Sequence, residues 1–340
     1  MTLLAYRLPA SAPATVLGQA PRLTTTVPKE YVHRACHAEV FLTGCRQQDD
    51  TTFTVTAQWP RAHTFFTSPD GVRHDPLQTA ETVRQVGLYL AHTQFGVPLD
   101  HHFLMWDLGY TTRPRQLSIG AAPTDLTITA EVTAQPRKTR TTVDFMLTTT
   151  LLRGDHVAAT GYTKFTTVPP ATYRRLRGPQ RAAHQDPHPD PLAPPMSQPM
   201  SQLTSQPMSQ PEPMPLAPGT VGRIDPRDVI LAPTGEPDTW RLTPNPRHPI
   251  LFDHANDHIP GMVLLEAARQ ATNALTTPTT ITPTGAAITY HRYAEHDQPT
   301  VVTARFTPGD DANALVTTVT GHQGGELVFT TVITGSPEHT

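Results

Sequence analysis

Alternating polar and apolar positions dominate this chain, and they fall into two sets separated by a long polar stretch. Such alternation is typical of half-buried antiparallel strands. In the first set it covers residues 53–59, 126–135, 139–152 and 156–168, with a turn predicted at Gly154-Asp155. In the second set it covers residues 229–233, 239–244, 286–293, 300–306, 314–322 and 326–334, with a turn at Gly324-Gly325.

One helix is expected in each set. The first is predicted over about residues 75–94, where Asp75 suits the N-cap, Pro76 suits the first helical position and Gln78 completes a capping-box spacing. The second is predicted over about residues 260–275. Strands, one central helix and an antiparallel run, given twice, predict an α+β domain in which a sheet wraps around a helix.

A short signature indicates that the two sets are copies. Glu-x-x-Arg-Gln occurs at Glu81–Gln85 and again at Glu266–Gln270, and a shift of 185 residues superimposes the two. The same shift maps His63 onto His248. We therefore expect two diverged copies of one domain.

Composition sets the predicted boundaries. Residues 174–220 are rich in Pro, Ser, Gln and Met and repeat Pro-Met-Ser-Gln, so they cannot bury enough apolar surface to offset chain entropy. We predict a disordered lead over 1–25, domains over 26–173 and 221–336, and a flexible linker over 174–220.

Charge and composition exclude several functions. The net charge is −3 and no helix-turn-helix pattern occurs, which disfavours a nucleic-acid-binding protein or a DNA-binding receptor. No apolar run approaches the roughly 20 residues needed to cross a bilayer. Two cysteines, Cys36 and Cys45, cannot make a disulfide framework. A cytoplasmic protein without membrane or nucleic-acid partners is predicted.

The segment from Asp253 to Gln270 resembles the hotdog acyl-thioester enzymes, of which the β-hydroxyacyl carrier-protein dehydratases are a well-known case. Pro260-Gly261 starts the helix, so a substrate carbonyl can approach free backbone N–H groups that stabilise an oxyanion. Glu266 stands among apolar residues, and burial is expected to raise its pKa towards that of a general base. The alternative is that Glu266 and Arg269 form a structural ion pair three residues apart.

Histidines near these helices are further candidates. His254 and His258 are four residues apart, as are Asp253 and Asp257, which would suit a metal if the segment were helical. Pro260 places the helix start later, and no HExxH motif accompanies the pair, so no metal or other cofactor is expected.

In the first copy, His63 is a candidate proton shuttle or a core histidine. Arg61 and Arg84 are candidate anion ligands, although Arg61 could also be an exposed surface charge. Arg84 is the stronger candidate because it stands one turn from Glu81 on a central helix.

Several segments together resemble the A-factor biosynthesis hotdog family. They are residues 27–34, 39–43, 58–63, 80–85 and 253–270, and the similarity spans both halves. The resemblance implies a tandem hotdog fold, each half an antiparallel sheet around a central helix. It also implies an acyltransferase that joins a β-ketoacyl chain, held as a thioester on acyl carrier protein, to dihydroxyacetone phosphate. This is the first step towards γ-butyrolactone, butenolide or furan signalling molecules.

The resemblance suggests roles for the candidates. Glu81 or Glu266, assisted by His63, His254 or His258, would take the proton from the alcohol. The predicted substrate-binding residues are Arg34, Arg61, Arg84, Gln85, Gly261, Arg269 and Gln270, with an arginine on the phosphate. The run Tyr173–Arg177 could dock the acidic carrier protein or simply end the domain.

Two other functions stay open at this point. A dehydratase or thioesterase could use the same fold, and a non-enzymatic protein could bind a lipid-like signal. The sequence does not say which copy's glutamate is active. The site could also form at the seam, with one half contributing a histidine and the other a glutamate.

Overall fold

A computed structural model describes residues 23–137, 141–178, 214–279, 281–307 and 315–337. The first half contains strands β1 Leu42–Gln47, β2 Thr52–Trp59, β3 His102–Thr112, β4 Thr124–Pro136, β5 Val143–Arg153 and β6 His156–Val168, and helices α1 Leu77–Thr93 and α2 Pro170–Arg177. The second half contains strands β7 Leu231–Pro233, β8 Thr239–Leu242, β9 Ile281–Tyr290, β10 Thr300–Thr307, β11 Leu315–Gln323 and β12 Glu326–Pro337, and helix α4 Gly261–Thr276.

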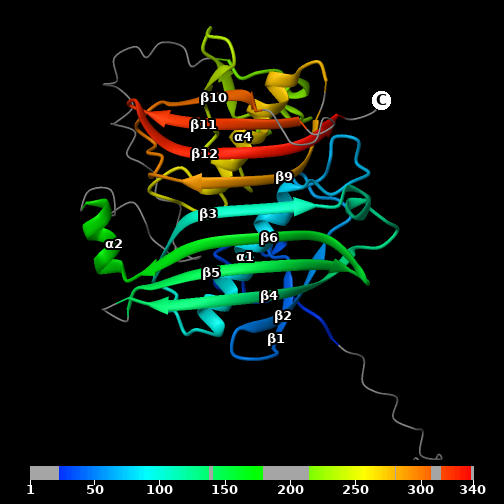
Figure 1. The fold of residues 1–340 in the computed structure, drawn as a ribbon, viewed down its shortest axis with the longest axis vertical. Helices are drawn as coiled ribbons and strands as arrows, with labels where there is room; N and C mark the ends of the chain where they lie inside the picture. Colours follow the sequence, from blue (N-terminus) through cyan, green and yellow to red (C-terminus); the bar gives the residue numbers. More distant parts are fainter. Residues whose placement is uncertain (1–22, 138–140, 179–213, 280, 308–314, 338–340) are drawn as a thin grey trace, which may run out of the picture.

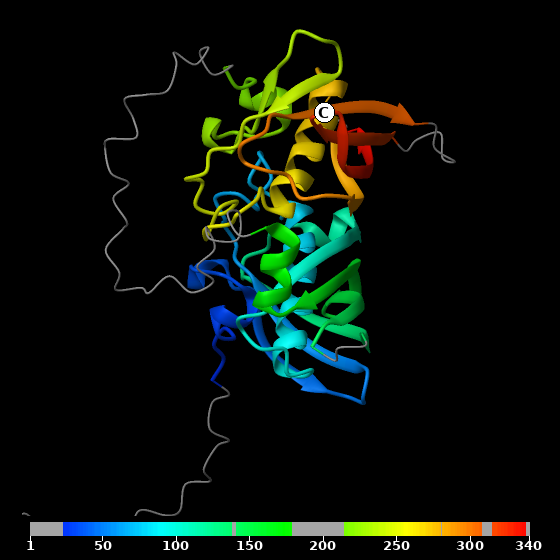
Figure 2. The same ribbon diagram turned by 90° about the vertical axis from the view of Figure 1, so that its left-hand side faces the viewer.

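All twelve strands form one antiparallel sheet in the order β1-β2-β4-β5-β6-β3-β9-β12-β11-β10-β8-β7. Each half of the sheet curves around its own central helix, α1 or α4 (Figures 1 and 2). The alternation predicted from the sequence matches the burial, since β4 buries every second residue from Thr124 to Val132. Gly161 of β6 permits close packing, because a Cβ there would lie 2.3 Å from Val83 of α1.

The two halves meet at β3 and β9, and this seam shapes the rest of the molecule. Residues Asp107 to Thr111 of β3 pair with Thr289 to Gly285 of β9. A register shift between Met105 and Asp107 interrupts β3, and its first residues pair only with β6. Among the described residues, the first residues of β3 therefore have no partner strand on the side of β9, and a gap in the sheet begins where the chain leaves β9.

The structure confirms both central helices and both predicted hairpins. Gly154, Gly324 and Gly325 all have positive φ, as tight turns between strands require. The capping box at α1 was a wrong prediction. Asp75 does accept the N–H of Leu77, but its own N–H donates to the carbonyl of Phe66 rather than to Gln78.

Three elements of the first half were not predicted from the sequence: strand β1, the seam strand β3 and helix α2. The run Tyr173–Arg177 belongs to α2, so residues 174–177 are helical rather than part of a linker. At the other end of the predicted linker, Pro218–Val221 form a short 3-10 helix, so residues 218–220 also belong to the second half. Residues 179–213 of the predicted linker and residues 1–22 of the predicted lead lie outside the described residues.

Candidate active site

Glu81 lies at the centre of a buried ion network on α1. Its side chain has no exposed surface, and its oxygens lie 2.7 Å from Arg34 Nη2 and 2.8 Å from Arg84 Nη2. Gln85, one turn further along α1, donates to the same carboxylate over 2.7 Å. Both carboxylate oxygens are therefore occupied by donors of the protein itself.

The second copy repeats this network on α4. Glu266 is equally buried and pairs with Arg223 over 2.8 Å and with Arg269 over 2.7 Å. Gln270 donates to it over 2.6 Å, as Gln85 does to its own glutamate. The predicted duplication is confirmed down to individual hydrogen bonds.

The expected rise in the glutamate pKa was wrong. Burial alone would raise the pKa of Glu81, but Arg34 and Arg84 outweigh it and lower the value to about 2. Arg223 and Arg269 lower the pKa of Glu266 to about 2 in the same way. The sequence showed one arginine for each glutamate and missed the second, which comes from a distant loop. A carboxylate of such low basicity is a poor proton acceptor at neutral pH.

The two glutamines of the signature serve the backbone. Gln85 is fully buried and donates to the carbonyl of Glu39, and Gln270 is fully buried and donates to that of Asp228. Each thereby ties its helix to the segment before the first strand of its half. Neither side chain lines either of the two cavities described below.

His63 organises a loop. Its Nδ1 accepts the N–H groups of Phe65 and Phe66, and its Nε2 lies 3.3 Å from Glu39. His248, its predicted counterpart, makes the same type of contacts, with Asp228 2.9 Å from its Nε2. Arg61 is exposed and donates to the carbonyl of Gly120, and it lines neither of the two cavities described below.

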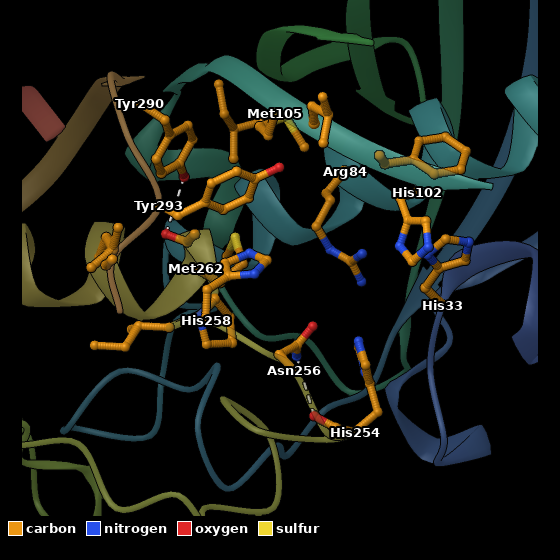
Figure 3. A pocket seen from close by; sticks show the side chains of 18 of the residues that line it. His33, Arg84, His102, Met105, His254, Asn256, His258, Met262, Tyr290 and Tyr293 are labelled. Atoms are coloured by element: carbon orange, nitrogen blue, oxygen red, sulfur yellow. Dashed lines mark hydrogen bonds between the residues drawn. The ribbon is translucent and has the colours of Figure 1, made fainter. Parts of the chain in front are cut away.

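A cavity of about 1020 Å³ lies at the seam, where the sheet opens beside β3 (Figure 3). Residues of both halves line it, and its wall combines apolar side chains with a few polar groups. Of the predicted site residues, those that line it are Arg34, Arg84, His254, His258 and Gly261. Arg269 lies instead beside a second, much smaller cavity.

His258 forms an acid–base dyad with Asp257. Its Nδ1 lies 2.6 Å from Asp257 Oδ1, and because a carboxylate only accepts, Nδ1 must carry the proton. Neutral His258 therefore has its lone pair on Nε2. Burial opposes ionisation of Asp257, but bonds from His258 and Arg177 outweigh it and lower its pKa to about 2. From the sequence, His258 was expected as a possible assistant to a glutamate base, but Asp257 only as part of a weak metal pattern.

Arg84 approaches the same space from α1. Its Nε and Nη2 donate to Glu81, and Nη2 also lies 3.2 Å from the carbonyl of Val32. Figure 3 shows its guanidinium projecting between His258 and His33. A cation aimed by a buried carboxylate into a cavity is suited to bind an anion.

Two histidines of the first half form a fixed pair beside Arg84. His92 Nδ1 lies 2.7 Å from the carbonyl of Val97, so it donates there, and its Nε2 accepts from His33 Nε2 over 2.9 Å. His33 lines the cavity and has φ of 51°, whereas the equivalent position after the short helix of the second half is Gly222, with φ of 66°. Such a conformation costs a non-glycine residue about 1 kcal/mol.

The start of α4 opens onto the cavity. Pro260 is the N-cap and offers no side-chain cap, so by helix geometry the N–H groups of Gly261 and Met262 have no acceptor within the helix. A Cβ at Gly261 would lie 2.9 Å from the ring of Tyr290, which explains the glycine. These donors can stabilise negative charge on a carbonyl oxygen.

The equivalent place in the other copy is closed. The 185-residue shift maps His258 to Arg73, His254 to Pro69 and Pro260 to Asp75, and these three line a cavity of only about 50 Å³. There Asp75 accepts an N–H at the start of α1 and lies 3.4 Å from Arg223. In the described part of the chain, only the place beside His258 therefore forms a large cavity, and its counterpart in the first copy is nearly filled.

Within the described ranges, no group of three or more His, Cys, Asp or Glu side chains is arranged to hold a metal ion. None of the described helices is long and apolar enough to span a bilayer.

Comparison with known proteins fits this architecture. The model of the A-factor biosynthesis hotdog domain matches residues 17–169 and again residues 204–337. The chain belongs to the A-factor biosynthesis hotdog family. The family predicted from sequence and the tandem hotdog fold are both confirmed.

Relatives within this family share one name. A protein of Streptomyces virginiae called 2-oxo-3-(phosphooxy)propyl 3-oxoalkanoate synthase is 42% identical over 92% of this chain and 98% of its own. Proteins of the same name from Streptomyces griseus and Streptomyces coelicolor are each 36% identical over 91% of this chain, covering 95% and 91% of theirs.

Similar solved structures include two thioesterases. A putative oleoyl thioesterase from Lactobacillus plantarum has a TM-score of 0.48 and 10% identity, covering 86% of this chain and 99% of its own. The 12:0-ACP thioesterase from Umbellularia californica has a TM-score of 0.47 and 11% identity, covering 84% and 94%.

Proposed function

We propose that this protein transfers a 3-oxoacyl group from a thioester to a hydroxyl of dihydroxyacetone phosphate, giving a 2-oxo-3-(phosphooxy)propyl 3-oxoalkanoate. The name shared by the relatives describes this product, and it supports the enzyme activity expected from the sequence. The observation that carries the proposal is one cavity, lined by His258 and Arg84 from opposite halves, at the uncapped start of α4.

His258 is the proposed base. Its Nε2 takes the proton from the substrate hydroxyl, and the resulting alkoxide attacks the thioester carbonyl. When the tetrahedral intermediate collapses, the carbon–sulfur bond breaks and His258 returns the proton to the leaving thiolate. Asp257 holds the imidazole in the required tautomer and stabilises its charged form, which is the role of an orienting carboxylate.

The start of α4 is the proposed oxyanion site. Negative charge develops on the carbonyl oxygen during attack, and the N–H groups of Gly261 and Met262 are the donors available at the cavity wall. Since no side chain caps this end, binding the oxyanion displaces no internal bond.

Arg84 is the proposed ligand of the substrate phosphate. Its ion pair with Glu81 fixes the guanidinium, and Arg34 supplies a second positive charge to the same carboxylate. These three directly paired groups carry a net charge of +1, from two arginines and one glutamate. In the closed copy, Asp75 also pairs with Arg223, so the corresponding four groups sum to zero. We therefore assign Glu81 and Glu266 to holding arginines rather than to proton transfer.

Lys29, His33 and His254 line the same cavity and add potential positive charge around the phosphate. An acyl carrier protein as the acyl donor and the cytoplasm as the location stay predictions from the sequence.

Product analysis tests the proposed reaction. The purified protein is incubated with a 3-oxoacyl thioester, with and without dihydroxyacetone phosphate, and the products are identified by mass spectrometry. We expect the phosphorylated ester only when both substrates are present. Free acid formed equally fast without the phosphate would indicate a thioesterase, a dehydrated acyl chain would indicate a dehydratase, and binding without turnover would indicate a ligand-binding protein.

A further inference from the structure

Helix α2 follows the last strand of the first half (Figure 1), and two of its side chains contact Asp257 in the loop before α4 of the second half. The Tyr173 hydroxyl lies 2.9 and 3.0 Å from the two carboxylate oxygens of Asp257. Arg177 Nε donates to Asp257 Oδ2 over 2.9 Å, and its Nη2 donates to the backbone carbonyl of the same residue over 3.1 Å. Two side chains of α2 thus hold one carboxylate.

The remaining Arg177 contacts fix its own position. Its Nη1 and Nη2 donate to Glu295 over 2.7 and 2.9 Å, and its guanidinium lies 4.1 Å above the ring of Tyr293. The Tyr293 ring in turn meets the His258 ring edge to face, with centroids 4.8 Å apart. Arg177 therefore contacts both groups that pack against the imidazole.

Tyr173 is held with equal firmness. It is almost fully buried, and its ring stacks on His102 of β3 with centroids 3.9 Å apart. By contrast, Arg174 and Arg175 on the same helix are exposed. The run Tyr173–Arg177, which suggested a docking surface, is therefore only partly exposed, because Tyr173 and Arg177 face inward.

We infer that Tyr173 and Arg177 are positioning residues for catalysis, holding Asp257 so that it orients His258. This inference rests on the proposed role of His258 as the base. The Asp257 carboxylate accepts hydrogen bonds from Tyr173, Arg177 and His258. The two bonds from α2 hold the carboxylate in the orientation in which its Oδ1 meets Nδ1 of the imidazole.

The electrostatic consequence has a definite sign. Both α2 donors withdraw charge from the carboxylate, and Arg177 places a positive charge near the imidazole. Removing either donor leaves a more basic carboxylate, which favours the protonated form of His258. The other titratable or charged groups around the dyad are His102 on β3, Tyr293 and Glu295 after β9, and Arg84 and His254 across the cavity. None of these changes in the variants below.

The test compares Tyr173→Phe and Arg177→Met with Arg175→Met, an exposed arginine on the same helix, and with His258→Gln. Rates of ester formation are measured against pH with each substrate varied in turn. We expect Tyr173→Phe and Arg177→Met to lower kcat by about tenfold or more, because a small misplacement of a catalytic group can cost that much. Their KM values should stay unchanged, and the acidic limb of kcat should move to higher pH. Arg177→Lys should restore part of the rate.

Two outcomes separate the inference from the proposed function. If His258→Gln keeps the full rate, the proposed base is wrong. If His258→Gln is inactive but the acidic limb of Tyr173→Phe stays at the wild-type position, only the positioning role is overturned. Tyr173→Phe retains the ring that stacks on His102, so it decides the matter even if Arg177→Met fails to fold.

Discussion

Arg84 and His258 face the same cavity from opposite halves of the chain, one from α1 and the other from the loop before α4. Neither half supplies both a fixed cation and a histidine dyad at this place. The two halves therefore share one large cavity, and the counterpart around Arg73 and Asp75 has a volume of only about 50 Å³.

The two signature glutamates should act on stability rather than on proton transfer. Glu266→Gln leaves Arg223 and Arg269 partly unpaired in the interior, and breaking such a buried pair typically costs about 3–5 kcal/mol. We expect a lower Tm in thermal unfolding, with kcat per folded molecule close to the wild-type value. A folded Glu266→Gln protein that lacks turnover would show that this carboxylate takes part in the reaction.

Acid should destabilise the protein through the same carboxylates. Their pKa is lowered in the folded state, so their stabilisation is complete above the unfolded value of 4.5 and is lost as the pH falls towards 2. A shift of this size corresponds to about 3 kcal/mol for each group. Thermal unfolding between pH 6 and pH 2.5 should show Tm falling below about pH 4.5. A Tm in Glu81→Gln that falls as steeply as in the wild type would contradict the assignment.

Arg84→Lys should weaken binding of the phosphorylated substrate. Lysine keeps the charge but loses the planar fork that pairs with both Glu81 and a phosphate. We expect KM for dihydroxyacetone phosphate to rise by about tenfold, equivalent to 1.4 kcal/mol, with little change in KM for the acyl thioester. Arg269→Lys, at the equivalent position beside the closed cavity, is the matched control. Equal effects of the two substitutions on this KM would argue against a phosphate site at Arg84.

Gly261→Ala should slow the reaction. The added Cβ meets the Tyr290 ring at 2.9 Å, so either the ring or the start of α4 must shift. Because oxyanion donors act only at the correct distance, we expect kcat to fall by about tenfold or more. Gly219→Ala is a suitable control, since a Cβ there meets nothing within 4 Å. An unchanged kcat in Gly261→Ala would place the oxyanion elsewhere.

Local pattern predicted most of the fold but not its seam. The alternation in β4, β5 and β6 arises because one face of these strands is buried in the core while the other faces solvent. Strand β3 lacks that pattern because a register shift near Trp106 interrupts it and its first residues border a cavity. Pairing between β3 and β9 joins residues about 180 positions apart, so no local signal marks it.

The candidate site shows the same limit. Helix spacing brought Glu81 and Arg84 together correctly, but the second arginine, Arg34, comes from a loop and reverses the expected pKa shift. The adjacent Asp257 and His258 were visible in the sequence. The sequence could not show that Arg177, 80 residues away, donates to the Asp257 carboxylate and fixes it beside His258.

The rate of the His258→Gln variant tests the central claim most directly. Glutamine retains much of the side chain's size but cannot accept and return a proton, and loss of a general base typically costs about 10²- to 10⁴-fold in rate. We predict a loss of kcat in this range with KM for both substrates nearly unchanged, while Arg73→Gln, at the equivalent position of the closed copy, keeps the wild-type rate. A His258→Gln enzyme that forms the ester as fast as the wild type would contradict the account.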